Sequence, residues 1–166
     1  MVISIVRIFT ITLFIFFLNG CSNFKPLYKN NLSSLYKLQG FSIVTDQKKI
    51  SKKIKKSLIE LFPTNKKTIY ILKIEGLSET SGIVSDTTRK ISRYKSQVSA
   101  KVKIYNRLKK YDKLVHEFEE VGSTSYSLIL NNIRSTIASK KSAELTSIRL
   151  LSEEIYKSVL VFLSKN

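Results

Sequence analysis

The 166-residue chain contains a single cysteine, Cys21, and no tryptophan. One cysteine cannot form an intramolecular disulfide, so packing alone must stabilise the fold. There are only five glycines and two prolines, and the glycine-containing phosphate-loop, dinucleotide-binding and nucleophile-elbow motifs do not occur. The one histidine, His116, has no partner at a metal-ligand spacing. We therefore expect a protein that is not an enzyme and has no cofactor and no metal.

Acidic residues are also scarce: 12 Asp and Glu stand against 29 Lys and Arg, and the formal net charge is +17. Such a surplus favours anionic partners, including phosphorylated lipid head groups, acidic glycans and nucleic acid. We expect no nucleic acid, because no arginine-rich or aromatic-interleaved motif accompanies the charge. A lysine-rich composition with a solvated surface would explain the charge equally well.

The one long apolar run lies at the N-terminus, from Ile8 to Leu18, and Arg7 is the only charge before it. A basic start, a short apolar stretch and small or polar residues before a cysteine are typical of a secreted lipoprotein. The run is shorter than the about 20 residues that span a bilayer. Counting from Val2 extends it, so a retained membrane helix is the alternative. We predict that residues 1–20 form a lipoprotein signal peptide and that Cys21 carries the lipid.

Residues 21–36 follow as a polar stretch rich in Asn, Lys and Ser, which we predict to be a lipidated tether. One apolar and aromatic cluster interrupts it, and this cluster can dock on the domain or on a partner. Its members are Phe24, Pro26, Leu27 and Tyr28. The remaining residues, 37–166, are long enough for one domain with a real core but not for two.

The apolar spacing of this domain predicts strands and helices. Strand patterns cover residues 38–45, 68–75, 89–105 and 114–121. Helical stripes cover residues 47–62, with Asp46 as the N-cap, and residues 145–162, with Ser142 as the cap. We predict that Gly76 ends the second strand, that residues 77–88 form a loop, and that residues 122–140 form a polar connection with a short helical turn.

The resulting order is β-α-β-β-β-α. Residues 97–105 alternate between apolar and polar side chains, which predicts a strand with one buried and one exposed face. The two helices are apolar on one side only. We therefore predict an α+β two-layer sandwich, in which two helices pack on one face of a mostly antiparallel sheet of about four strands.

Basic residues gather on the predicted hairpin of the last two strands, where they can hold phosphates by charge-assisted hydrogen bonds. These binding candidates are Arg89, Arg93, Lys101, Lys103, Arg107, Lys109 and Lys110. The polar face of the helix at residues 47–62 carries six further lysines. That face can meet anionic lipid, or it can simply be solvated.

His116 and a group of carboxylates lie on the second strand of this hairpin. Glu117, Glu119 and Glu120 could act as acids or bases, but they face many lysines, so charge compensation is the favoured interpretation. A lone histidine with no nucleophile motif is best explained as structural. An envelope hydrolase built on these residues is therefore the least favoured function.

The stretch that begins at Cys21 reads Cys-Ser-Asn-Phe-Lys-Pro-Leu-Tyr. It resembles the start of the mature LPS-assembly lipoproteins of the LptE family, in particular the alphaproteobacterial ones, which typically read Cys-Gly-Phe-x-Pro-Leu-Tyr. This chain has one extra residue and lacks the glycine. The segment Gly122–Tyr126, the pair Ala143-Glu144 before the last helix, and the order of elements are also similar to that family.

The resemblance implies an outer-membrane lipoprotein on the periplasmic side. Such a protein assists the assembly of the β-barrel lipopolysaccharide translocon (an LptD-like protein), plugs it, and binds lipopolysaccharide on its way to the cell surface, without catalysis. Ser22, rather than Asp, after the lipidated cysteine agrees with the outer membrane. Phe24, Pro26, Leu27 and Tyr28 become candidates for contact with the barrel, and the seven basic hairpin residues become candidates for lipopolysaccharide binding.

The alternative is a structural or chaperone-like periplasmic lipoprotein for another envelope complex. The segment from Phe24 to Tyr28 distinguishes the two functions, since it belongs to the resemblance.

Overall fold

A computed structural model describes residues 38, 40–62, 68–84, 91–107, 111–128 and 132–165. Its elements are β1 (Phe41–Thr45), α3 (Lys49–Leu61), β2 (Tyr70–Val84), β3 (Ile91–Arg107), β4 (Asp112–Ser127) and α4 (Ile133–Lys165). The four strands form one sheet in the order β1-β2-β3-β4, in which β1 is parallel to β2 and the other neighbours are antiparallel. The predicted fold class and the order β-α-β-β-β-α are confirmed. The predicted signal peptide and tether, with Cys21, lie outside the described residues.

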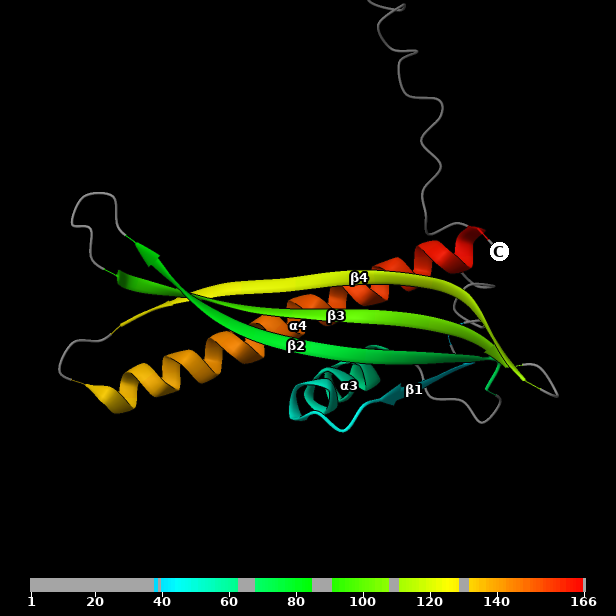
Figure 1. Ribbon diagram of the computed structural model, residues 1–166, viewed down its shortest axis with the longest axis horizontal. Helices are drawn as coiled ribbons and strands as arrows, with labels where there is room; N and C mark the ends of the chain where they lie inside the picture. The colour runs from blue at the N-terminus through cyan, green and yellow to red at the C-terminus, as the bar shows by residue number, and fades with distance from the viewer. Residues whose placement is uncertain are drawn as a thin grey trace, which may run out of the picture. The chain divides into compact units, whose positions relative to one another are not determined.

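Both helices cover the same face of the sheet (Figure 1): α3 contacts β1 and β2, and α4 contacts β3 and β4. The alternation of apolar and polar side chains in β3 explains why both helices pack on this face. Val98, Val102 and Ile104 are fully buried beneath the helices, whereas Lys101 between them is exposed. Burying each aliphatic side chain contributes about 1.5–3 kcal/mol. The core therefore lies between the sheet and the helices, and no described helix or strand covers the other face of the sheet.

Helix α4 approaches β4 closely at Gly122. A Cβ atom added at Gly122 would lie 2.1 Å from the backbone oxygen of Ser147 and 2.6 Å from the backbone nitrogen of Leu151. The buried Ser147 hydroxyl donates to the backbone oxygen of Ser96 on β3 (2.9 Å). The helix axis can approach the sheet this closely because residue 122 has no side chain.

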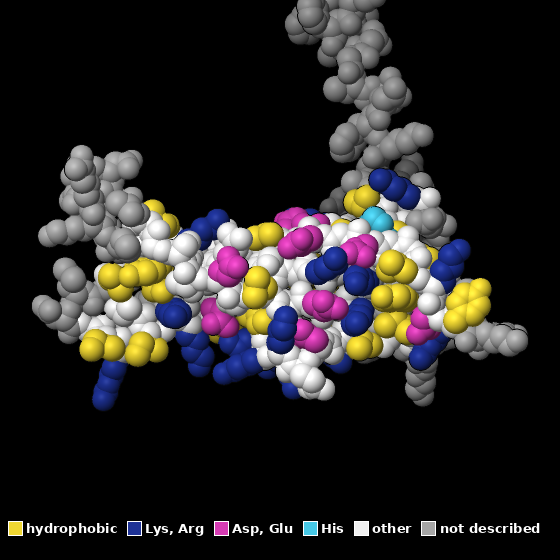
Figure 2. All heavy atoms as spheres, in the orientation of Figure 1, with side chains coloured by type: hydrophobic (Ala, Val, Ile, Leu, Met, Phe, Trp, Pro, Cys, Tyr) yellow, Lys and Arg dark blue, Asp and Glu magenta, His cyan; other side chains and the backbone are white. Residues whose placement is uncertain are grey.

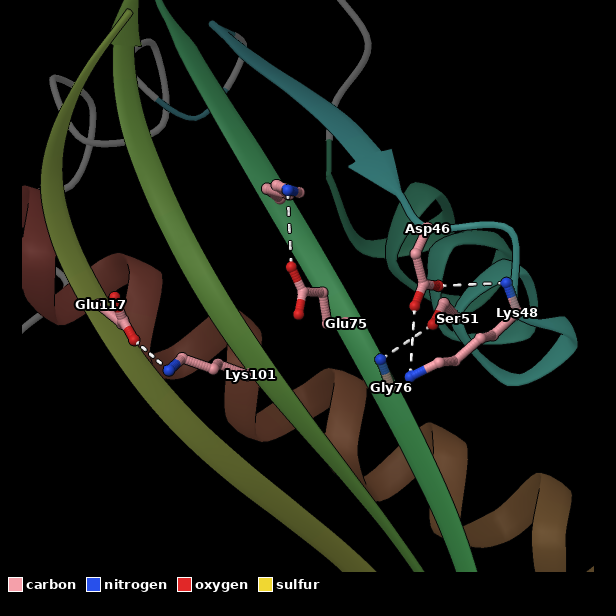
Figure 3. Close-up of polar contacts among 8 residues, drawn as sticks. Asp46, Lys48, Ser51, Glu75, Gly76, Lys101 and Glu117 are labelled. Carbon is pink, nitrogen blue, oxygen red and sulfur yellow. Dashed lines mark hydrogen bonds and ion pairs between the residues drawn. The ribbon is translucent and has the colours of Figure 1, made fainter.

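A second small-residue contact joins α3 to β2. The backbone N–H of Gly76 donates to the Ser51 hydroxyl at 2.9 Å (Figure 3). A Cβ atom at Gly76 would lie 2.6 Å from Cδ1 of Ile54. The prediction that Gly76 ends its strand is wrong, because Gly76 pairs with Ala100 and lies within β2. The absence of a side chain at Gly76 leaves room for α3, and the glycine does not break the strand.

Two segments that the sequence predicts as connections begin as continuations of strands. The predicted loop after Gly76 continues β2 to Val84, and the predicted connection after Val121 continues β4 to Ser127. Both extensions lack an apolar alternation. Residues 77–84 have no β1 beside them, because β1 pairs with Tyr70–Ile74 only. Their pairing with β3 therefore depends on backbone hydrogen bonds and not on a buried face.

The long helix α4 begins at Ile133, nine residues before the predicted cap at Ser142. Asn132 is the true cap: its side-chain oxygen accepts a hydrogen bond from the backbone N–H of Ser135 (3.0 Å). The predicted cap of α3 is also wrong, since Lys48 occupies that position without a side-chain bond and Asp46 lies two residues earlier. A hydrogen bond from Ser51 lowers the pKa of the Asp46 carboxyl.

We expect Gly122→Ala to destabilise the protein by about 3 kcal/mol or more, because the added methyl group forces α4 away from β4 across a well-packed core. Urea unfolding followed by circular dichroism measures the change. Ser123→Ala, at the neighbouring exposed position, is the matched control and should leave stability nearly unchanged. Equal stability of the two variants would contradict the close contact.

Candidate binding surface

The open face of the sheet is the candidate binding surface. It carries the side chains of β2, β3 and β4 that alternate with the buried ones. The strand register places them in rows, and the two central rows are Lys73–Lys103–Glu117 and Glu75–Lys101–Glu119. Figure 2 shows this face, on which basic and acidic side chains are interspersed. The open face is thus a mixed-charge surface and not a uniformly basic one.

Specific ion pairs link these rows. The Lys101 ammonium lies 2.7 Å from a Glu117 carboxylate oxygen (Figure 3). The Lys73 ammonium lies 3.6 Å from a Glu75 carboxylate oxygen. The hydrogen bond from Lys101 lowers the pKa of Glu117, and the same bond raises the pKa of Lys101. The compensation expected from the sequence is therefore present at Glu117. Both side chains are partly exposed, so salt screens their attraction.

The structure brings some of the predicted lipopolysaccharide-binding residues onto one surface. The odd-numbered positions of β3 place Arg93, Lys101, Lys103 and Arg107 on the open face. Arg93 donates to the Ser125 hydroxyl at 2.8 Å. The other basic candidates, Arg89, Lys109 and Lys110, lie outside the described residues, as do the barrel-contact candidates Phe24, Pro26, Leu27 and Tyr28.

An apolar row on the same face was not predicted from the sequence. Leu77 on β2 and Val121 on β4 flank Ser99 in one cross-strand row. They are 52% and 47% exposed. Leu77 lies in this row only because β2 continues past Gly76. A prediction that ends the strand at Gly76 therefore cannot identify the apolar row. Exposed aliphatic side chains among paired charges are the composition that a protein partner buries.

The helix α3 carries the most concentrated positive charge in the described part of the chain. Lys53 pairs with Glu144 on α4, and Lys48 lies 3.6 Å from Asp46. No described carboxylate lies within ion-pair distance of the remaining lysines of this face, which are Lys49, Lys52, Lys55 and Lys56. Lysines in the first turn also face the positive end of the helix dipole. The uncompensated lysines give this face a positive potential.

His116 takes part in an aromatic stack. Its ring lies 5.3 Å from the ring of Phe162 at an interplanar angle of 12°, and 5.5 Å from that of Phe118. The three rings line a groove of about 300 Å³ beside the end of α4. Nearby, the Ser158 hydroxyl donates to Glu120. These contacts agree with the structural role expected of His116.

Metal-ligating side chains do not cluster in the part of the chain that the structure describes. Nowhere among these residues do three His, Cys, Asp or Glu side chains come close enough to hold a metal ion. Within the same residues, neither helix combines the length and the apolar character needed to cross a bilayer.

We expect Glu117→Gln to lower Tm slightly at neutral pH, because it removes the ion pair with Lys101. The folded pKa of Glu117 lies below its ordinary value of 4.5, so the pair stabilises the fold above that pH and is lost as the pH falls through the folded pKa. Thermal unfolding of the wild type and Glu117→Gln from neutral to acidic pH should therefore show that the difference in Tm shrinks in acid. The difference should also shrink in high salt. Glu79→Gln is the control, since its register partner is Gln97. A difference that is independent of pH would contradict the ion pair.

Known structures share the fold of this chain, but the sequence comparisons identify no relative. No family model matches the chain, and no curated protein matches it. The chain is similar in structure to a "putative lipoprotein" from Caulobacter crescentus, with a TM-score of 0.65 and 12% identity, covering 82% of this chain and 99% of the other. It is also similar to a minor lipoprotein from Acinetobacter baumannii, with a TM-score of 0.58 and 12% identity, covering 75% and 92% of the two chains.

A third similar structure is the uncharacterized lipoprotein B from Nitrosomonas europaea, with a TM-score of 0.53 and 13% identity, covering 75% of this chain and 83% of the other. At these identities the likeness establishes the fold. Almost the whole length of each of the first two lipoproteins is matched, so the sandwich described above is the architecture that they share with this chain.

Proposed function

We propose that the protein is a non-enzymatic lipoprotein of the outer membrane, anchored through Cys21 on the periplasmic side. In this proposal it assists the assembly of the β-barrel lipopolysaccharide translocon, plugs it, and binds lipopolysaccharide during transport. The observation that carries the proposal is the shared fold: lipoproteins from three organisms have this sandwich, with TM-scores of 0.65, 0.58 and 0.53. The mature start from Cys21 to Tyr28 supports the family independently of the fold.

The open face suits contact with a protein wall. Leu77 and Val121 offer exposed apolar area on β2 and β4. The rows of Lys101 and Lys103 beside them are matched by carboxylates, so burying the face would not leave a large excess of one charge. Charge pairs at the rim and apolar contacts at the centre are the usual arrangement of a stable interface.

The cations on β3 suit phosphate groups. Arg93, Lys101, Lys103 and Arg107 all lie on the open face of β3. A phosphate that binds Lys101 must compete with Glu117, which lies 2.7 Å from it. Binding at this row should therefore be moderate and should weaken as salt rises, because the contacts are exposed and charge-assisted.

We expect Leu77→Asp/Val121→Asp to lose the barrel in a pull-down of the lipidated protein from detergent-solubilised outer membranes, since two carboxylates would be desolvated at the contact. Ile137→Asp, at an exposed position of α4, should retain it. Pro26→Ala/Tyr28→Ala should also impair recovery of the barrel. A wild-type protein that recovers no barrel would overturn the proposal, and recovery of a different envelope complex would favour the alternative.

We expect Lys101→Ala/Lys103→Ala to weaken lipopolysaccharide binding about tenfold in a filter or calorimetric assay, because two charge-assisted contacts are lost. Lys52→Ala/Lys55→Ala removes the same charge from α3 and is the matched control. Equal losses in both double variants would show that net charge, and not the open face, attracts lipopolysaccharide.

A further inference from the structure

One end of the domain combines exposed apolar side chains with cations. The end of β3, the start of β4 and the end of α4 meet there, and we call it the hairpin end. Its exposed apolar residues are Tyr111 (65% exposed), Leu114 (45%), Val115 (38%) and Val161 (47%). Its exposed cations are Arg107, Lys113 and Lys165. In Figure 2 hydrophobic side chains gather at the end of the domain where α4 finishes.

Leu114, Val115 and Val161 line two adjoining grooves at this end. One groove, of about 300 Å³, runs between the start of β4 and the last turns of α4, and Lys165 stands at its wall. The other, of about 330 Å³, is lined by Tyr70, Asn106 and Lys113. Val115 and Phe162 line both of them. The register shift between Ile104 and Tyr105 sets Val115 out of the regular pairing, between the partners His116 and Leu114.

The charge of the hairpin end is of one predominant sign. Asp112 is the only carboxylate among the described residues that form it, and it lies opposite Arg107 in the register. Glu120 contacts this end only through Ser158 at the groove. This leaves Lys113 and Lys165 without a carboxylate at ion-pair distance among the described residues. The open face differs, because its cations alternate with glutamates. Apolar side chains ringed by lysines are the composition of a surface that lies in a membrane interface.

The chain also enters the domain at this end. The backbone oxygen of Gly40 accepts hydrogen bonds from the N–H groups of Ile69 (2.7 Å) and Tyr70 (2.9 Å), and the Arg107 N–H donates to Ile69 (2.8 Å). The start of β1 therefore lies at the same end of the sheet as the end of β3, with the start of β2 between them. The predicted lipid site, Cys21, is 17 residues before Leu38 (38 − 21). The predicted tether therefore joins the domain at its hairpin end.

We propose that the hairpin end is a membrane-contact surface, which places Tyr111, Leu114, Val115 and Val161 in the head-group region of an anionic phospholipid leaflet. Arg107, Lys113 and Lys165 pair with lipid phosphates around them. The tether supplies a high effective concentration of lipid, so a modest intrinsic affinity is sufficient to orient the domain. The proposal requires neither the barrel nor lipopolysaccharide, so it stands or falls separately from the proposed function.

The lysine face of α3 is the competing surface. It has more cations, but interfacial binding grows with buried apolar area as well as with charge. The hairpin end has both, and it lies where the chain enters the domain. The two surfaces can therefore be distinguished by where the protein contacts vesicles.

The absence of tryptophan from the sequence allows a single reporter. We would use the chain from residue 21 onward with Cys21→Ala, so that no acyl chain contributes; every described core residue lies within 38–165. Tyr111→Trp should show a blue-shifted emission with vesicles of phosphatidylethanolamine and phosphatidylglycerol, and brominated phosphatidylglycerol should quench it. Ile137→Trp, about 36 Å away from Val161 along α4 by helical rise, is the control and should show neither effect. An unshifted Tyr111→Trp, or an equal shift in both variants, would overturn the proposal.

Charge variants test the same surface without an aromatic substitution. Each cation near an anionic leaflet contributes about 1 kcal/mol, so Lys113→Gln/Lys165→Gln should lower the vesicle partition coefficient about thirty-fold at low salt. Lys52→Gln/Lys55→Gln changes the charge equally and should have little effect. Equal losses, no loss in either pair, or a loss confined to the α3 pair would each overturn the proposal.

A last control addresses self-association. Val161→Asp should abolish vesicle binding, while sedimentation should show both the wild type and Val161→Asp as monomers without lipid. A wild-type dimer that Val161→Asp dissociates would assign the hairpin end to a second copy of the chain and overturn the membrane proposal. Circular dichroism of each variant confirms that the fold is kept.

Discussion

The close approach of α4 to β4 determines most of this structure. At Gly122 the helix backbone takes the place that a side chain would fill, since a Cβ there would meet the Ser147 oxygen at 2.1 Å and the Leu151 nitrogen at 2.6 Å. Ser147 adds a hydrogen bond to Ser96 and so connects the helix to β3 as well. Because α4 is held against β3 and β4, the remaining width of the sheet is available to α3, which makes a similar small-residue contact at Gly76.

Among the described residues, both helices pack on one face of the sheet and the other face is left open. The strands that bury Val98 and Val102 must present Lys101 and Lys103 on the opposite side, since successive side chains alternate. Glu117 and Glu119 of β4 then lie beside these lysines through the register of the hairpin. The mixed-charge face is therefore a direct result of strand alternation and pairing, and it offers a partner both apolar contacts and ion pairs.

The sequence predicts the parts of the fold that depend on burial. Residues 97–105 alternate because the helices cover one side of β3, and α3 shows a helical stripe because Ile54 and Leu58 face the core. The missed parts have other causes. The second half of β2 is polar because neither β1 nor a buried face supports it, and Gly122 is present for α4, although glycine usually indicates a turn. The open-face apolar row could not be found without the register of both strand pairs.

The first turns of α4 have a different kind of stability from the rest of the helix. No residue of α4 before Ala143 is buried, and the hydrogen bond from Ser135 N–H to Asn132 supports its start. A helix as short as residues 133–142 is marginal in water by itself. Residues 133–142 therefore open at a smaller free-energy cost than the part of α4 that packs on the sheet. Amide hydrogen exchange would thus divide one continuous helix into a labile beginning and a protected end. The protected end is the part that carries Ser147 and Leu151 onto β4.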